Sequence, residues 1–293
     1  METGSMTALV SAFARAYHFQ NECVRVFEDS VAKQLLGERY EQIAAHMTAG
    51  VQWFEPGFSG TAEEGLRRIV NKRLAPTPLA RAAFAERALR QAAACGARQY
   101  LILGAGYDTF AFRQEDWAKK LKIFEVDRET VQEEKRIAAE QAKLPLPENL
   151  FFVPADLSAP DWTEALRAQE AFDCGRITFC SALGLSYYLL PKDFEALLGG
   201  LMALLPEGSA VAFDYPEAEN QWKSALAAAA GEGMQGGYRP GELEARLTRQ
   251  GLRLCEQIGP EQINGRFFAW RNLFSPDKIT AEEGVHFALA VKK

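Results

Sequence analysis

The chain lacks the features that mark membrane-bound and secreted proteins. The longest uncharged run, from Ile177 to Pro191, is shorter than the roughly 20 mostly apolar residues that a membrane-spanning helix needs. The N-terminus has neither the basic stretch nor the apolar core of a signal peptide. We therefore expect a cytoplasmic, soluble protein with no membrane partner.

Basic charge and paired cysteines are lacking as well. The net charge is −6 over 293 residues, whereas general nucleic-acid binders carry a strong basic excess that releases phosphate counterions. We therefore predict no nucleic-acid partner. The cysteines are odd in number, scattered and without a C-x-x-C pair, which predicts reduced thiols and neither a disulfide framework nor a metal site. They are Cys23, Cys95, Cys174, Cys180 and Cys255.

The first part of the chain has helical periodicity and no strand-like run. Residues 1–96 are therefore predicted to form a helical N-terminal cap. One helix is expected between Asn21 and Gly37, and a second after the capping-box spacing that begins at Thr61. A third is expected to begin at Pro78 and to end at Gly96.

From residue 97 onward, short β-rich runs alternate with helical ones. This alternation predicts an α/β fold: a Rossmann-like domain over 97–293 with a mainly parallel seven-stranded sheet, helices on both faces and an antiparallel terminal strand. A glycine-rich stretch, about 216–240, is predicted to be a lid-like insertion. The expected strands are Gln99–Leu103, Leu121–Val126, Phe151–Val153, Arg176–Cys180, Ser209–Phe213, Leu252–Gln257 and Val285–Val291.

The first expected strand carries the main chemical signal. It runs into Gly104-Ala105-Gly106, where glycine permits positive φ and close approach of a ligand to the backbone. The second strand ends at Asp127, where a carboxylate can accept hydrogen bonds from both ribose hydroxyls of an adenosine. Together these features predict a nucleotide site. The alternative is a tight turn beside an unrelated surface carboxylate.

Two phosphate-binding patterns are missing around this turn. Thr109 stands where the dinucleotide fingerprint has a third small residue, and no Gly-Lys-Ser/Thr of a P-loop follows. An adenosine cofactor without a phosphate group to bind, such as S-adenosyl-L-methionine, fits this pattern. An NAD(P)-dependent oxidoreductase with an irregular turn remains the alternative.

A family resemblance follows from these motifs. The run from Arg98 to Arg113, centred on Leu-Gly-Ala-Gly-Tyr-Asp-Thr, and the segment from Phe124 to Asp127 resemble the leucine carboxyl methyltransferase family, including its bacterial polyketide-type O-methyltransferases. The resemblance implies a class I methyltransferase fold with a helical cap. It further implies S-adenosyl-L-methionine-dependent O-methyl transfer to a small-molecule or exposed carboxylate or hydroxyl, a protein C-terminal carboxylate included.

The resemblance also assigns cofactor-binding residues. Gly104, Ala105 and Gly106 would pass beneath the methionine part of the cofactor, and Asp127 would hold the ribose. Arg81 matches the arginine that pairs with the cofactor carboxylate, for which the planar guanidinium is suited. The alternative for Arg81 is a solvated helix face.

Asp156 and Leu157 would contact the adenine, because a carboxylate accepts from its amino group and leucine offers an apolar face. The alternative for Asp156 is a cap to the following turn. Leu183, in contrast, departs from the family, many of whose members have a glutamate near the sulfonium end of the cofactor. Ser181 or Ser186 would then compensate, or the chain is a catalytically silent cofactor-binding member.

The sequence names no catalytic residue. Methyl transfer by in-line displacement depends mainly on alignment of the acceptor. The three histidines, His18, His46 and His286, are more easily explained as structural residues. A carboxylate acceptor needs no base at neutral pH, whereas an alcohol or phenol does. The acceptor and the oligomeric state are left open.

Overall fold

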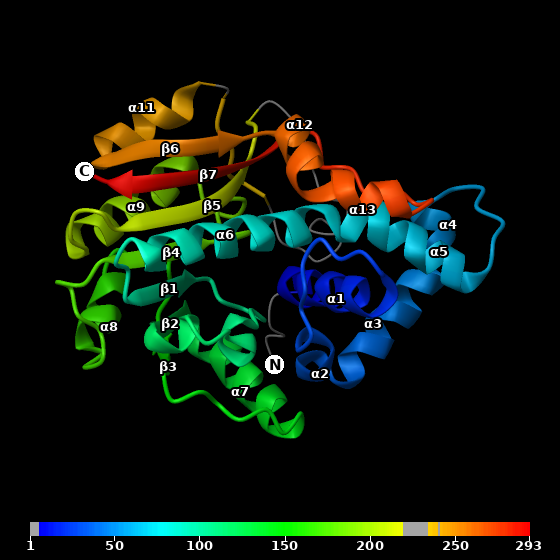
Figure 1. Cartoon of the computed structure of the whole chain (residues 1–293), viewed down its shortest axis with the longest axis horizontal. Helices are drawn as coiled ribbons and strands as arrows, with labels where there is room; N and C mark the ends of the chain where they lie inside the picture. The colour runs from blue at the N-terminus through cyan, green and yellow to red at the C-terminus, as the bar shows by residue number, and fades with distance from the viewer. Residues whose placement is uncertain (1–5, 219–233, 240) are drawn as a thin grey trace.

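The protein, described by a computed structural model over residues 6–218, 234–239 and 241–293, is built around a single seven-stranded sheet (Figure 1). The strand order is β3-β2-β1-β4-β5-β7-β6, and β7 runs antiparallel to both of its neighbours. This confirms the predicted α/β fold. The strands are β1 (Gln99–Leu103), β2 (Lys122–Asp127), β3 (Leu150–Pro154), β4 (Thr178–Ala182), β5 (Ala210–Pro216), β6 (Leu252–Ile258) and β7 (Val285–Lys292).

Helices precede the sheet, connect its strands and cover both of its faces (Figure 1). Those before the sheet are α1 (Met6–Asn21), α2 (Ala32–Leu36), α3 (Glu38–Ala49), α4 (Val51–Phe54), α5 (Ala62–Ile69), the π-helical turn η1 (Val70–Leu74) and α6 (Pro76–Ala94). Those after β1 are η2 (Phe110–Arg113), η3 (Ala118–Lys120), α7 (Glu129–Gln141), α8 (Trp162–Ala168), α9 (Pro191–Leu204), α11 (Glu242–Arg249), α12 (Pro260–Ile263), η4 (Asn264–Phe268) and α13 (Ala269–Phe274).

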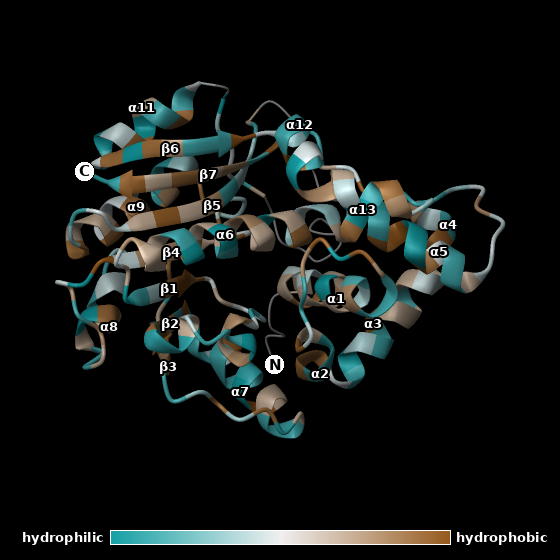
Figure 2. Ribbon diagram, viewed as in Figure 1, coloured by the Kyte–Doolittle hydropathy of each residue, from teal (hydrophilic) through white to brown (hydrophobic). Residues whose placement is uncertain are grey.

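Alternation of side chains along the strands produces two hydrophobic cores. On β1, Tyr100 and Ile102 pack into the core that includes α1 and α6, whereas Leu101 and Leu103 pack into the core that includes α8, α9 and α11. Strands β5 and β7 carry mostly hydrophobic residues, while the edge strand β6 is more hydrophilic (Figure 2). A sheet covered on both faces leaves its strand ends as the place for a ligand.

One predicted helix is wrong. Only α2 is helical between Asn21 and Gly37, because side chains replace helical hydrogen bonds over the preceding residues. Asp29 Oδ1 accepts from the backbone N–H groups of Val31 and Ala32, at 3.3 and 3.0 Å. His18 Nε2 accepts from the N–H of Val26 at 2.8 Å. The short side chain of Asp competes with helical hydrogen bonding in this way, and the His18 ring satisfies a further backbone N–H.

The other front helices follow the sequence more closely. The capping box at Thr61 is confirmed: its side chain accepts from the N–H of Glu64, whose carboxylate accepts from the N–H of Thr61. Helix α6 begins at Pro76, two residues earlier than predicted, because η1 leads directly into it. Helix α6 then lies against β4, β5 and β7.

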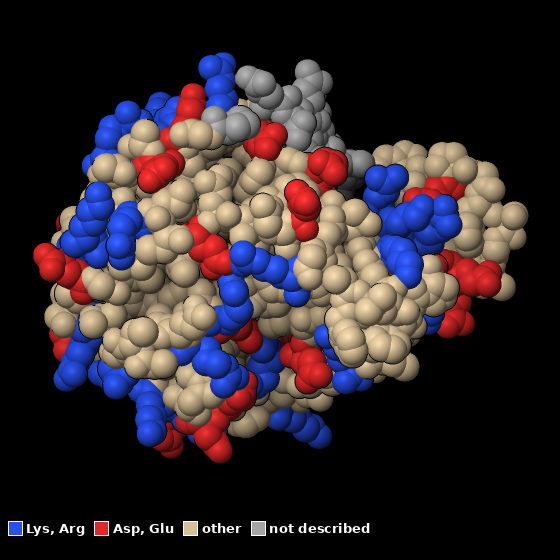
Figure 3. Space-filling view, turned by 45° about the horizontal axis from the view of Figure 1, so that its top comes forward, with Lys and Arg blue, Asp and Glu red and all other residues tan. Residues whose placement is uncertain are grey.

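The predicted insertion, 216–240, lies mostly outside the described residues. Its two ends meet where β5 ends: the N–H of Tyr238 donates to the Pro216 carbonyl, and the N–H of Ala218 to the Tyr238 carbonyl, each at 3.0 Å. Within the described ranges, no helix is both long and apolar enough to cross a bilayer. Acidic and basic side chains are interspersed over the face shown in Figure 3.

Candidate functional site

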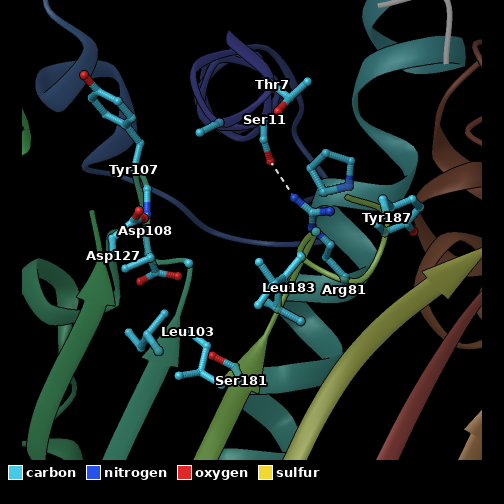
Figure 4. Close-up of a pocket in the computed structure, with 18 of the residues that line it drawn as sticks. Thr7, Ser11, Arg81, Leu103, Tyr107, Asp108, Asp127, Ser181, Leu183 and Tyr187 are labelled. Carbon is cyan, nitrogen blue, oxygen red and sulfur yellow. Dashed lines mark hydrogen bonds between the residues drawn. The ribbon is translucent and has the colours of Figure 1, made fainter. Parts of the chain in front are cut away.

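A cavity of about 610 Å³ opens at the carboxyl ends of β1, β2 and β4, beneath α1 and α6 (Figure 4). All of the cofactor-site residues predicted from the sequence line it. They are Arg81, Gly104, Ala105, Gly106, Asp127, Asp156, Leu157 and Leu183. Segments far apart in the chain therefore converge on one ligand-sized space, as expected at the strand ends of a parallel sheet.

The glycine turn after β1 needs its glycines. Gly104 and Gly106 have φ of +67° and +46°, a region that residues with a side chain rarely adopt. A Cβ on Gly106 would also lie 3.1 Å from the Cβ of Ala8 on α1. The turn thus presents bare backbone to the cavity while α1 packs closely over it.

Asp127 is fixed at the end of β2 by backbone groups. Its Oδ2 accepts from the N–H of Gly106 at 2.7 Å, and its Oδ1 from the N–H of Arg128 at 2.8 Å. A carboxylate has about four lone-pair positions, so acceptor capacity remains for a ligand in the cavity. The turn and the acid, predicted as a pair, are joined directly.

Asp156 serves a local turn and also lines the cavity. Its Oδ1 accepts from the hydroxyl and the backbone N–H of Ser158, at 2.7 and 2.9 Å. These two hydrogen bonds lower the pKa of Asp156 and keep its carboxylate ionised, and the bond from the hydroxyl has the larger effect. Leu157 beside it is half-buried and adds an apolar surface. The turn expected as the alternative for Asp156 is therefore present along with the cavity position.

Arg81 does not lie on a solvated helix face. Its Nη1 is 3.1 Å from Oδ2 of Asp214, a fully buried carboxylate at the end of β5, and its Nη2 donates to the Ser11 hydroxyl at 3.1 Å (Figure 4). Burial opposes the charge, but Asp214 together with Tyr187 and Tyr188 outweighs it, and the pKa of Arg81 is raised. The guanidinium has further N–H groups that these bonds do not use.

Gly184 makes this arrangement possible. Its N–H donates to Oδ1 of Asp214 at 2.6 Å, and its φ is +70°. A Cβ at this position would lie 2.7 Å from Nη1 of Arg81. Sequence reasoning missed Asp214 as a partner of Arg81, although an acid directly after an apolar strand is the same signal that identified Asp127.

Leu183 lines the cavity and packs against the core that includes α1 and α6. Two serines were considered as compensation for the missing glutamate. Ser181 lines the cavity, and its hydroxyl is hydrogen-bonded to the Tyr100 hydroxyl at 2.9 Å. Ser186 instead donates to the backbone carbonyl of Asp214 at 2.6 Å. Only Ser181 is therefore placed to meet a ligand.

Among the described residues, no histidine lines the cavity. His18 is buried, and burial lowers its pKa to about 3, so the ring is neutral and accepts the Val26 bond. His286 is 2.6 Å from Glu217 and stacks on Tyr215. Both act as structural residues. The described ranges also hold no cluster of acidic, histidine and cysteine side chains suited to a metal ion.

The front of the chain is tied to the glycine turn by a buried charge cluster. The Asp29 carboxylate lies 2.9 Å from Arg15 Nε on α1 and accepts from the Thr109 hydroxyl at 2.7 Å. Burial favours the protonated acid, but Arg15 and Arg113 outweigh it and lower the pKa of Asp29. Thr109, which breaks the dinucleotide fingerprint, therefore holds the front against the turn.

Comparison with known proteins agrees with this geometry. The family model described as leucine carboxyl methyltransferase matches residues 8–202. The chain belongs to the leucine carboxyl methyltransferase family. It is 35% identical over 306 aligned positions, covering 99% of this chain and 98% of the other, to YktD of Bacillus subtilis (strain 168), a protein named as a candidate S-adenosyl-L-methionine-dependent methyltransferase. The cofactor in that name is the one predicted from the sequence.

Two solved structures share the fold. A DUF574 family protein from Streptomyces avermitilis MA-4680 aligns with a TM-score of 0.56 and 16% identity, covering 99% of this chain and 98% of the other. A candidate methyltransferase from Thermobifida fusca YX aligns with a TM-score of 0.55 and 15% identity, covering 99% and 96%. The Rossmann-like methyltransferase fold with N-terminal helices is thus confirmed over the whole length.

Proposed function

We propose that this member of the leucine carboxyl methyltransferase family is an S-adenosyl-L-methionine-dependent O-methyltransferase whose acceptor is a small molecule with a hydroxyl or carboxyl group. The observation that carries the proposal is the direct bond between Asp127 and the glycine turn in a cavity that Arg81 also lines. Asp127 offers an acceptor for ribose hydroxyls, the glycine turn offers bare backbone, and Arg81 offers a cation for a carboxylate.

The chemistry of the lining residues fits the cofactor. Asp127 would bind the ribose, Asp156 and Leu157 the adenine, and Arg81 the methionine carboxylate, while Gly104, Ala105 and Gly106 pass beneath the methionine part. The bound cofactor would supply a methyl group on a sulfonium, which is already electrophilic. The chain therefore has to bind, orient and exclude water.

Helix α1 supports this role because it closes the cavity opposite the strand ends. Thr7 and Ser11 of α1 face the cavity above Leu183 (Figure 4). Alignment of two reactants in a closed space supplies much of the rate enhancement of such a displacement. The nicotinamide alternative has less support, because Thr109, hydrogen-bonded to Asp29, occupies the position where the dinucleotide fingerprint has a small residue for close helix–strand packing.

Calorimetry and a transfer assay test the proposal. S-adenosyl-L-homocysteine should bind and NADH should not. Tritium from methyl-labelled cofactor should pass to members of a panel of phenols and carboxylic acids. Tight NADH binding would favour an oxidoreductase. Cofactor binding without transfer to any member of the panel would favour the silent cofactor-binding alternative.

A further inference from the structure

One carboxylate that lines the cavity is not among the predicted cofactor residues. Glu282 precedes β7, and its half-buried side chain lines the cavity. Its Oε2 accepts from the Thr77 hydroxyl at 3.1 Å, and no described residue donates a hydrogen bond to its Oε1. Thr77 lies one helical turn before Arg81 on α6, so Glu282 and Arg81 meet the same face of that helix.

The sheet places Glu282 away from the adenosine end. Because β7 is antiparallel, the start of β7 lies at the same edge as the carboxyl ends of the parallel strands. Neighbouring strands are about 4.8 Å apart, and β1, β4 and β5 separate β2, which ends at Asp127, from β7. Glu282 therefore lies on the far side of the cavity from Asp127, where its charge interacts with that of Arg81.

The pKa of Glu282 lies above the ordinary range of a glutamate. Burial raises its pKa to about 7, against the Thr77 hydrogen bond and the positive charge of Arg81. Asp214 on β5 adds to the rise, and Arg73 on η1 opposes it. Tyr187, which follows β4, also faces this group, and its own pKa lies well above the usual value, mainly because of burial.

The other lining carboxylates each receive a backbone N–H. Asp108 accepts from Phe110 at 2.8 Å, and Asp127 and Asp156 are held in the same manner. Each such bond occupies part of the acceptor capacity of a carboxylate. Glu282 receives no backbone N–H from the described residues. It is thus the lining acid suited to exchange a proton near neutral pH.

We propose that Glu282 is the general base of the methyl transfer and that the acceptor is therefore a phenolic or alcoholic hydroxyl. This inference rests on the proposed function and narrows its acceptor. The acceptor hydroxyl donates to Oε1 of Glu282. Its oxygen forms the bond to the methyl carbon as the carbon–sulfur bond breaks, with that electron pair left on sulfur, and its proton moves to Glu282 and then to water.

A carboxylate acceptor fits this end of the cavity poorly. A carboxylate acceptor is negatively charged at neutral pH, and Glu282 is negatively charged in the ionised form that can accept a proton. Like charges at close range repel, most strongly where water is excluded. A neutral hydroxyl instead gains a charge-assisted hydrogen bond to the ionised carboxylate.

The test compares Glu282→Gln with Glu283→Gln, a change at the exposed neighbouring acid. The probes are para-substituted phenols and matched benzoic acids, with transfer measured from pH 5.5 to 8.5. For the wild type and Glu283→Gln, kcat/KM for the phenols should rise with pH and level off above about 7. In Glu282→Gln, kcat/KM for the phenols should fall about 10²- to 10⁴-fold and should no longer depend on pH. Its affinity for S-adenosyl-L-homocysteine, measured by calorimetry, should be unchanged.

A second readout is independent of turnover. With carboxyl-¹³C-labelled glutamate, the buried Glu125 and Glu282 should both titrate near pH 7 in the wild type, and the resonance that is absent from Glu282→Gln is that of Glu282. In Thr77→Val, that resonance should titrate at higher pH, because the hydrogen bond that lowers the pKa is removed. The pH at which kcat/KM for the phenols levels off should rise by the same amount.

The outcomes separate the two proposals. Transfer to benzoic acids but not phenols would overturn the base assignment and leave O-methyl transfer intact. Retention of phenol methylation by Glu282→Gln, or titration of Glu282 in the ordinary range of glutamate, would also overturn it. Failure of the wild type to bind S-adenosyl-L-homocysteine would instead overturn the proposed function.

Discussion

The two ends of the cavity use the same residue types in different ways. At the β2–β3 end, Asp127 and Asp156 are half-exposed or exposed and are held by backbone N–H groups. At the β5–β7 end, the fully buried Asp214 pairs with Arg81 and also accepts from the backbone N–H of Gly184, and the half-buried Glu282 accepts from the Thr77 hydroxyl. The β2–β3 end therefore presents carboxylate oxygens that are held in place and can accept hydrogen bonds from a ligand. The second holds buried charge, so its protonation and its stability depend on particular partners.

The largest expected effect comes from breaking the buried pair. Asp214→Asn leaves Arg81, whose side chain is only 18% exposed, without its buried charge partner, which should lower the free energy of unfolding by on the order of 3 kcal/mol. Denaturant unfolding measures it. Asp116→Asn, which removes the exposed partner of Lys119, is the control and should change little. Equal unfolding curves for wild type and Asp214→Asn would show that the pair does not stabilise the fold.

The matching change at the other end should affect ligand binding and not folding. Asp127→Asn keeps an oxygen for a backbone N–H but loses the charge that ribose hydroxyls would meet. Affinity for S-adenosyl-L-homocysteine should fall about ten- to a hundred-fold, because a hydrogen bond to a charged group contributes roughly 1.5–3 kcal/mol. Calorimetry on the folded variant decides. An unchanged dissociation constant would remove Asp127 from the site.

Arg81→Lys tests whether the guanidinium recognises a carboxylate. An ammonium keeps the charge but cannot make two parallel hydrogen bonds, so S-adenosyl-L-methionine should bind roughly ten-fold more weakly. The decarboxylated cofactor should bind the wild type and the variant about equally. If both ligands weaken alike, the change acts through Asp214 and Ser11, which Arg81 also contacts.

Leu183→Glu should have the smallest effect. A carboxylate near the sulfonium and ammonium groups of the cofactor should tighten its binding, but desolvation offsets part of the gain, so we expect less than a ten-fold change. Leu183→Gln, without the charge, is the control. Weaker cofactor binding by a folded Leu183→Glu would show that this part of the cavity is packed around the leucine.

Much of the fold could be predicted because its signals are local. Each strand begins and ends within three residues of its predicted bounds, since β-rich runs between turns report burial directly. The helix expected between Asn21 and Gly37 failed because its hydrophobic spacing is that of a helix, while Asp29 and His18 bind the backbone instead. Periodicity does not record such side-chain competition.

Reasoning from the residues alone predicts one end of the candidate site, whereas Arg81 at the other end was assigned by the family resemblance. The glycine turn and Asp127 stand in a fixed order along one βαβ unit, so their proximity follows from the sequence. Arg81 and Asp214 are 133 positions apart, and Glu282 reaches the cavity only because β7 inserts between β5 and β6. No local sequence pattern predicts that Asp214 pairs with Arg81 or that Glu282 lines the cavity.

The central claim is that this cavity binds S-adenosyl-L-methionine with its adenosine at the β2–β3 end. A crystal structure with S-adenosyl-L-homocysteine tests it most directly. The account predicts the ribose on Asp127, the adenine beside Asp156 and Leu157, and the amino-acid carboxylate near Arg81, with Glu282 left on the open acceptor side. A ligand bound elsewhere, or bound with its adenine towards Glu282, would contradict it.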